Sequence, residues 1–156
     1  MQWSEVISDK SLQNLPYKIE LNEYGKIIMS PVSNKHGFYQ AEMSRLLHNQ
    51  LTQGKTITEC SIQTPKGVKV ADVAWLSATF LHQNSLDETP FLAASEICVE
   101  IISPSNSESK MQEKFNFTFN KVLKKYGWSV SRVPSDFLML LVKKRSAFDV
   151  TIDLAF

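Results

Sequence analysis

Residues 97–102 read Ile-Cys-Val-Glu-Ile-Ile, an almost continuous apolar run with one carboxylate, Glu100, inside it. A run of this length, followed at once by Ser103-Pro104, is typical of a central β-strand that is covered on both faces. It predicts a layered fold with this strand at its centre. Glu100 then needs an explanation, because a buried carboxylate is costly unless a cation or several hydrogen-bond donors compensate its charge.

A second acid lies in a similar apolar setting. Asp72 sits within Val70-Ala71-Asp72-Val73-Ala74-Trp75, and the strand predicted over 68–75 is separated from another, over 56–64, by a Pro-Lys-Gly turn. Two carboxylates on two apolar strands predict a shared divalent cation, and Mg²⁺ is commonly held by only one or two carboxylates with waters and a substrate phosphate. The alternatives are a solvent-facing Asp72 or one paired with Lys69, and a Glu100 held in a buried structural ion pair.

The rest of the chain supplies short strands and helices around this pair of acids. Residues 18–30 predict a β-hairpin with a turn at Asn22–Gly25, residues 36–53 predict a helix with apolar residues at helical spacing, and residues 77–82 predict a short helical turn. A further helix is expected to begin at Ser105, which has the spacing of a capping box with Glu108. Together these elements predict an α/β domain with a mixed sheet flanked by helices.

Composition limits the classes of protein to be considered. A chain of 156 residues is long enough for one domain, and 17 Lys and Arg against 16 Asp and Glu leave a net charge of +1, so contact with nucleic acid would need a local basic patch. Cys60 and Cys98 have no partners at metal-ligand spacing, which favours a reduced cytoplasm. No apolar run approaches 18 residues, so neither a signal peptide nor a membrane span is expected.

The order of four motifs resembles the Uma-type family of small bacterial restriction endonucleases, which has the PD-(D/E)XK nuclease-like fold. These motifs are Ile28-Met29-Ser30-Pro31 at the end of the hairpin, His36-Gly37 at the start of the long helix, the segment 70–75 and the segment 96–107. The resemblance runs from about Pro16 to Lys114. It implies a restriction-endonuclease-like α/β core, Mg²⁺ held by Asp72 and Glu100, and hydrolysis of DNA.

The catalytic lysine of the wider superfamily is missing from its usual place. Two residues after Glu100 stands Ile102, which can neither stabilise a developing charge nor orient a water. The resemblance implies that a lysine on the next helix takes this role. Lys114 occupies that place, with Lys110 one turn earlier as the fallback and a solvated helix lysine as the alternative.

Two further residues are candidates for the site. Glu20 would complete the acidic cluster, although an exposed hairpin carboxylate is the simpler interpretation. His36 opens the long helix, where its ring faces either the site or solvent, and we favour solvent slightly.

Residues 115–156 depart from the pattern of the first 114. Phe115, Phe117 and Phe119 alternate like a strand where a helix has just begun, so the local signals conflict. The family continues with a Gly-Ala turn and a strand containing tryptophan. Reading the codons of residues 120–128 one base upstream permits the peptide QGAKEVW, which supplies both. We therefore hypothesise a shift of reading frame near Lys114; a genuinely divergent C-terminal segment is the alternative.

These observations predict one domain, with a nuclease-like core over residues 1–114 and a divergent segment of the same domain over 115–156. The predicted function is Mg²⁺-dependent endonucleolytic cleavage of DNA, with Asp72 and Glu100 as metal ligands and Lys114 at the attacked phosphate. The competing function is a catalytically inactive DNA-binding or protein-interaction remnant. DNA is the expected partner, no membrane is involved, a homodimer is considered, and the expected location is the cytoplasm.

Overall fold

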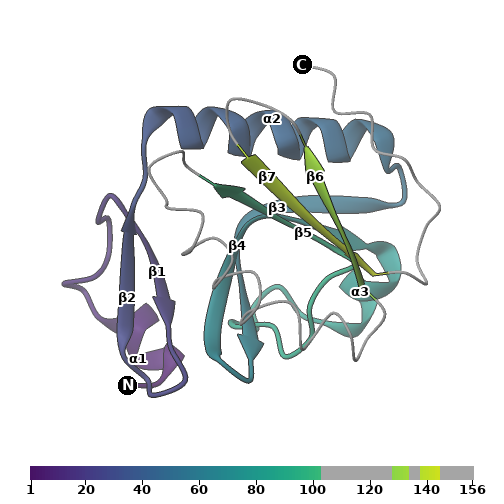
Figure 1. Cartoon of the computed structure of the whole chain (residues 1–156). Helices are drawn as coiled ribbons and strands as arrows, with labels where there is room; N and C mark the ends of the chain where they lie inside the picture. Colours follow the sequence, from purple (N-terminus) through teal and green to yellow (C-terminus); the bar gives the residue numbers. More distant parts are fainter. Residues whose placement is uncertain (103–127, 134–137, 145–156) are drawn as a thin grey trace.

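The protein is built from a two-stranded and a five-stranded β-sheet with helices packed against them (Figure 1). This is a computed structural model, and it describes residues 1–102, 128–133 and 138–144. In the larger sheet the strand order is β3-β4-β5-β7-β6. The elements are α1 (Trp3–Ser8), β1 (Tyr17–Leu21), β2 (Ile27–Pro31), α2 (Asn34–Gln50), β3 (Gly54–Thr64), β4 (Gly67–Ser77), α3 (Ala78–Gln83), β5 (Ile97–Ile102), β6 (Trp128–Val133) and β7 (Leu138–Lys144).

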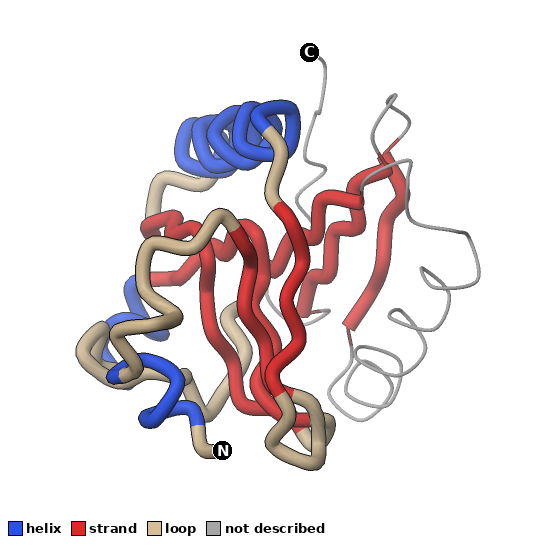
Figure 2. Tube along the Cα trace, turned by 90° about the vertical axis from the view of Figure 1, so that its left-hand side faces the viewer, coloured by secondary structure: helices blue, strands red, loops and turns tan. Residues whose placement is uncertain are grey.

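The two faces of the larger sheet are covered by different helices. Helix α2 buries Met43 and Leu47 against a cluster that includes Val73, Trp75 and Val99. Helix α3 buries Phe80 in a second cluster, which also contains both cysteines, Ala74 and Leu76. Successive residues of a strand point to opposite faces, so β4 and β5 contribute to both clusters and are buried on both sides, as the apolar run of 97–102 predicts. Figure 2 shows α2 at the top of the view, on one side of the strands of the larger sheet.

Most of the predicted elements are confirmed, with shifts at their ends. Helix α2 begins at Asn34 because Ser33 is its N-cap and accepts a hydrogen bond from the backbone N–H of His36 at 3.2 Å. It ends at Gln50, three residues before the predicted end at residue 53. The hairpin, the β3–β4 pair, the short helix α3 and the central strand β5 all lie where the sequence predicts them.

Strands β3 and β4 form a long antiparallel pair that is distorted beside Asp72. Thr58 pairs with Val73 and Cys60 pairs with Ala71, but no ladder pair joins Glu59 to Asp72 between them. Glu59 has a φ of 53°, in the left-handed region that a glutamate rarely adopts. The sheet is therefore locally irregular at the point where it presents Asp72.

The β1–β2 hairpin packs beside β4 as a separate small sheet (Figure 1). Leu21 of β1 joins Val68 and Val70 of β4 in a third apolar cluster. Helix α1, which the sequence does not predict, closes this cluster with Trp3 and Val6. Gly67 begins β4 with a φ of 92°, and a Cβ there would lie 2.4 Å from the carbonyl oxygen of Asn22, so a side chain would push the hairpin away.

The central strand β5 has one neighbour from each half of the chain. It pairs antiparallel with β4 through Val73↔Val99 to Trp75↔Ile97, and antiparallel with β7 from Ile97↔Lys143 to Ile102↔Leu138. Every ladder in the described ranges is antiparallel, and the parallel component there is an isolated bridge between Ile62 and Phe91. The predicted α/β fold class, with a sheet flanked by helices, is confirmed. The helix expected at Ser105 lies outside the described residues, as do Lys110 and Lys114.

Candidate functional site

Asp72 and Glu100 lie on adjacent strands and are both buried. Their exposed fractions are 0% and 4%. The register of β4 against β5 places them just beyond the Val73↔Val99 pair, one on each strand. Asp72 Oδ2 accepts a hydrogen bond of 2.6 Å from the backbone N–H of Ile101, so the Asp72 side chain is fixed against the strand that carries Glu100.

Lys18 of β1 joins the two acids. Its Nζ donates to Asp72 Oδ1 at 2.7 Å and to Glu100 Oε2 at 3.1 Å, and Lys18 itself is only 7% exposed. Lys18, which the sequence does not single out, and not Lys69, is therefore the ion-pair partner of Asp72, and Glu100 lies in a buried ion pair, the alternative stated for it above. A signal existed in the alternation of Lys18 and Glu20 with apolar residues, because residues two apart in a strand share a face.

Glu20 lies on the same face of β1 as Lys18 and is also buried, at 6% exposure. Its carboxylate accepts from the backbone N–H of Val70 at 3.1 Å and from Lys69 Nζ at 3.4 Å. Strand β5 pairs with β4 only at residues 73–75 of β4, so at Val70 the Glu20 side chain takes the place of a strand partner. The interpretation of Glu20 as an exposed hairpin carboxylate is therefore wrong, and Lys69 is its ion-pair partner.

His36 points toward the acids and not toward solvent, contrary to the interpretation that we favoured. Its Nε2 lies 3.3 Å from Asp72 Oδ1, and its side chain is 14% exposed. Although the distance is short, Nε2 is a buried nitrogen that makes no hydrogen bond of acceptable geometry within the described structure. The contact is therefore electrostatic.

Gln40 of α2 fixes the backbone at Asp72. Its Nε2 donates to the carbonyl oxygen of Asp72 at 2.7 Å and to Glu59 Oε1 at 2.6 Å. These bonds connect the helix to both strands at the irregular point of the β3–β4 pair. Gln40 therefore positions Asp72 through its main chain, without contacting the carboxylate.

The charges in this cluster compensate one another. Burial by itself would raise the pKa of Asp72, but His36, Lys18 and the backbone N–H of Ile101 together lower it to about 2. Burial would lower the pKa of Lys18, but the carboxylates of Glu100, Asp72 and Glu20 outweigh that effect and raise it above its usual value. Both side chains are therefore charged over the whole neutral range.

The donor set fits a small divalent cation. Asp72 and Glu100 offer hard carboxylate oxygens that already converge on one positive atom, Lys18 Nζ. His36 Nε2 is an adjacent unsatisfied nitrogen. Within the ranges that the structure describes, no group of three or more His, Cys, Asp or Glu side chains has the geometry of a metal site. A cation bound here would accordingly rely on two carboxylates and on oxygens from water or substrate.

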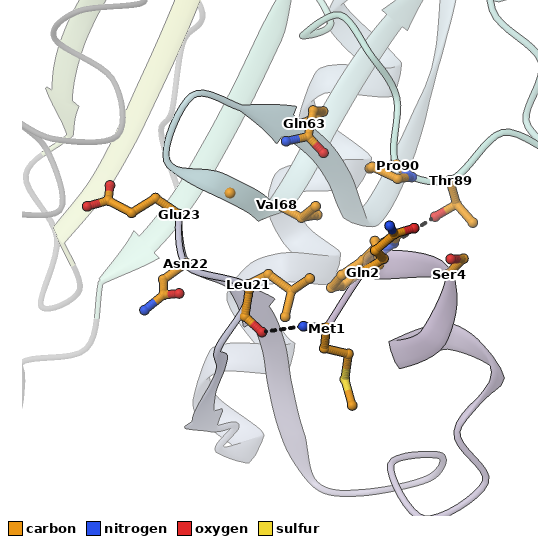
Figure 3. A pocket seen from close by; sticks show the side chains of 13 residues that line it. Met1, Gln2, Ser4, Leu21, Asn22, Glu23, Gln63, Val68, Thr89 and Pro90 are labelled. Carbon is orange, nitrogen blue, oxygen red and sulfur yellow. Dashed lines mark hydrogen bonds between the residues drawn. The ribbon is translucent and has the colours of Figure 1, made fainter.

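A hollow at the surface lies away from these residues. It has a volume of about 410 Å³ and is lined by the start of α1, the hairpin turn, the β3–β4 turn and the loop between α3 and β5, including Gln2, Glu23 and Thr89 (Figure 3). None of the candidate site residues lines it. Cys60 and Cys98 are free thiols buried in the core, and burial raises the pKa of Cys98 to about 12, so this thiol packs as a small core residue.

The described sheets and helices form an α/β domain consistent with the restriction-endonuclease-like class. Comparison with protein families gives a match of residues 9–126 to the model of Uma2, putative restriction endonuclease, and the chain belongs to this family. The resemblance on residues 16–114 is thus confirmed, and the match extends past Lys114. No curated protein and no solved structure matches the chain. Among the described helices, none is long and apolar enough to cross a bilayer.

Proposed function

We propose that this chain hydrolyses DNA phosphodiester bonds with Mg²⁺ held between Asp72 and Glu100. Membership of a nuclease family supports a nuclease with a DNA substrate. The observation that carries the finer proposal is the convergence of two buried carboxylates, from adjacent strands, on one cationic atom at 2.7 Å and 3.1 Å. A buried carboxylate costs free energy unless a cation compensates it, so two acids that converge on one point form a place suited to a cation.

The residues around the acids would have distinct tasks. Asp72 and Glu100 would hold the ion, which when bound supplies an activated water and neutralises charge on the attacked phosphate. The Ile101 N–H and Gln40 would keep Asp72 oriented, as partners behind metal ligands generally do. His36 lies close enough to Asp72 to contact a water of the ion.

Lys114 is the proposed partner of the attacked phosphate, and Lys110 is its fallback. Both belong to the part of the chain outside the described ranges, and their role rests on the family resemblance and on Ile102 standing at the usual lysine position. The division into a core over 1–114 and a divergent segment over 115–156, with a frame shift near Lys114, also remains a proposal. We likewise propose that this segment reduces the activity, that the protein forms a homodimer and that it is located in the cytoplasm.

A second candidate is a catalytically inactive DNA-binding or protein-interaction remnant. Lys18 favours this second candidate, because its ammonium already forms ion pairs with both carboxylates and no metal is needed to compensate their burial. The two candidates differ in one property that can be measured. The nuclease binds Mg²⁺ and cleaves DNA, whereas the remnant does neither.

The test is cleavage of supercoiled plasmid DNA by the full chain and by a frame-restored version, with Mg²⁺ or with EDTA. Asp72→Asn and Glu100→Gln should each lower the Mg²⁺-dependent rate by at least about a hundredfold, more than the loss of an outer partner costs. Asp87→Asn and Glu88→Gln remove exposed acids by the same substitutions and should retain the wild-type rate. Cleavage that persists in the Asp72 and Glu100 variants would remove the assignment. Absence of both cleavage and Mg²⁺ binding would favour the remnant.

A further inference from the structure

We infer that Lys18 is an exchangeable internal cation, which holds Asp72 and Glu100 together in the metal-free protein and must leave them when a divalent ion binds. This inference rests on the proposed function, since it concerns the same pair of acids. Lys18 Nζ lies at hydrogen-bond distance from one oxygen of each acid, so it occupies the point on which the acids converge.

The space between the acids holds one cation at a time. A Mg²⁺ ion sits about 2.1 Å from carboxylate oxygens, closer than the 2.7 Å of the Lys18 contact, and therefore inside the volume that the ammonium fills. A second positive charge at such a distance would also be strongly repelled. An ion that uses Asp72 Oδ1 and Glu100 Oε2 consequently displaces Lys18 Nζ.

Lys18 is suited to move without disturbing the fold. Its backbone is fixed in β1, where it pairs with Ser30 of β2, but its charge sits at the end of a flexible four-carbon stem. Glu20 lies two residues further along the same face of β1 and offers a carboxylate to which the displaced ammonium can turn. The amine thus exchanges one buried acid for another, and its charge stays compensated.

The exchange has a thermodynamic consequence. With Lys18 in place, the fold does not depend on a metal, because neither buried acid is left uncompensated. Each binding event must also break two charge-assisted hydrogen bonds, which weakens the affinity for the ion. Lys18 therefore positions the acids and sets the metal affinity of the site.

The first experiment compares Lys18→Met with the wild type and with Lys26→Met, which removes an exposed lysine from the same hairpin. Ca²⁺ serves as the probe, in calorimetric titration and in thermal unfolding with Ca²⁺ or EDTA. Lys18→Met should bind Ca²⁺ at least about tenfold more tightly than the wild type. In EDTA the melting temperature of Lys18→Met should be lower than that of the wild type, and Ca²⁺ should raise it by more. Lys26→Met should match the wild type in melting temperature and in Ca²⁺ affinity. Unchanged or weaker Ca²⁺ affinity in a folded Lys18→Met would overturn the inference.

A second experiment uses the wild-type protein, so it does not depend on the folding of a variant. The ¹⁵N-labelled ammonium of Lys18 is buried and hydrogen-bonded, and its nuclear magnetic resonance signal should shift or disappear as Ca²⁺ saturates the site. A signal unchanged at saturation would show that the ammonium stays in place. If Lys18→Met gains affinity but no DNA is cleaved, the nuclease proposal fails and the exchange stands. If Mg²⁺-dependent cleavage occurs, but Lys18→Met has the Ca²⁺ affinity of the wild type and the Lys18 ammonium signal does not change at saturation, the exchange fails and the nuclease stands.

Discussion

Replacing Asp72 with Asn should destabilise the metal-free protein by about 2 kcal/mol at neutral pH. The contacts with His36, Lys18 and the Ile101 N–H lower the pKa of Asp72 from 3.8 to about 2, so they stabilise the charged carboxylate in the folded protein. A pKa difference of this size between the unfolded and folded states corresponds to about 2 kcal/mol. The amide of Asn cannot reproduce the charge, and its NH₂ group would face a donor in either orientation, the ammonium of Lys18 or the N–H of Ile101.

The loss should depend on pH in a defined direction. Because the pKa of Asp72 is lower in the folded protein, its stabilisation is fully present above the unfolded value of 3.8 and is lost as pH falls through the folded value of about 2. Urea denaturation in EDTA, followed by circular dichroism, should therefore show the full difference between wild type and Asp72→Asn at neutral pH. The difference should shrink below a pH of about 4.

The exposed loop residue Asp87 provides the control. Asp87→Asn should follow the wild-type free energy of unfolding across the same range of pH, because its side chain lies at the surface. A difference between wild type and Asp72→Asn that stays constant down to a pH of about 3 would contradict the linkage to this carboxylate. An Asp72→Asn protein more stable than wild type at neutral pH would show that the cost of burial exceeds the value of the contacts.

Three further predictions concern other parts of the chain. Met43→Ala should lower the free energy of unfolding by about 3 kcal/mol in urea denaturation, because this side chain of α2 is fully buried. Phe38→Ala removes a side chain of the same helix that is 60% exposed, and it should change the free energy of unfolding by less than about 0.5 kcal/mol. Similar losses in both variants would contradict the assignment of the core. Gln40→Ala should slow Mg²⁺-dependent cleavage about tenfold with little change in stability, as expected for a residue behind a metal ligand, and an unchanged rate would remove that role. Backbone amides of 138–142 should exchange faster than those of 97–102, because conflicting local signals precede the later strand, whereas equal protection would indicate a firmly integrated C-terminal segment.

Local patterns predicted the elements that carry the acids. Strand β5 was evident from its apolar run, β4 from its valines and tryptophan, and α2 from its helical spacing, because each pattern reflects burial along a single element. Asp72 and Glu100 are singled out for the same reason, since each is a carboxylate within an otherwise apolar strand. Their closeness in the structure follows from the pairing of the two strands.

The partners of the acids were not predictable in the same way. Lys18 and Glu20 belong to a hairpin that lies beside β4 without joining its ladder, so no strand register connects them to Asp72. Local sequence describes Glu20 as an ordinary hairpin carboxylate, and only the packing of β1 on β4 places it against the Val70 N–H. Helix α1 was missed because six residues are too few to establish a helical period. Its order comes from burial of Trp3 and Val6.

The pairing of β5 with β7 bears on how this protein tolerates change. The edge of a strand offers backbone N–H and C=O groups, and any neighbour with an extended backbone can satisfy them, whatever its side chains. The strand that carries Glu100 can therefore keep a partner even if the downstream sequence is rewritten wholesale, provided that the new stretch can extend. Lys18, Asp72 and Glu100 all precede residue 102. Evolution can thus replace the later third of such a gene while the charged cluster, which depends on particular side chains, is inherited unaltered.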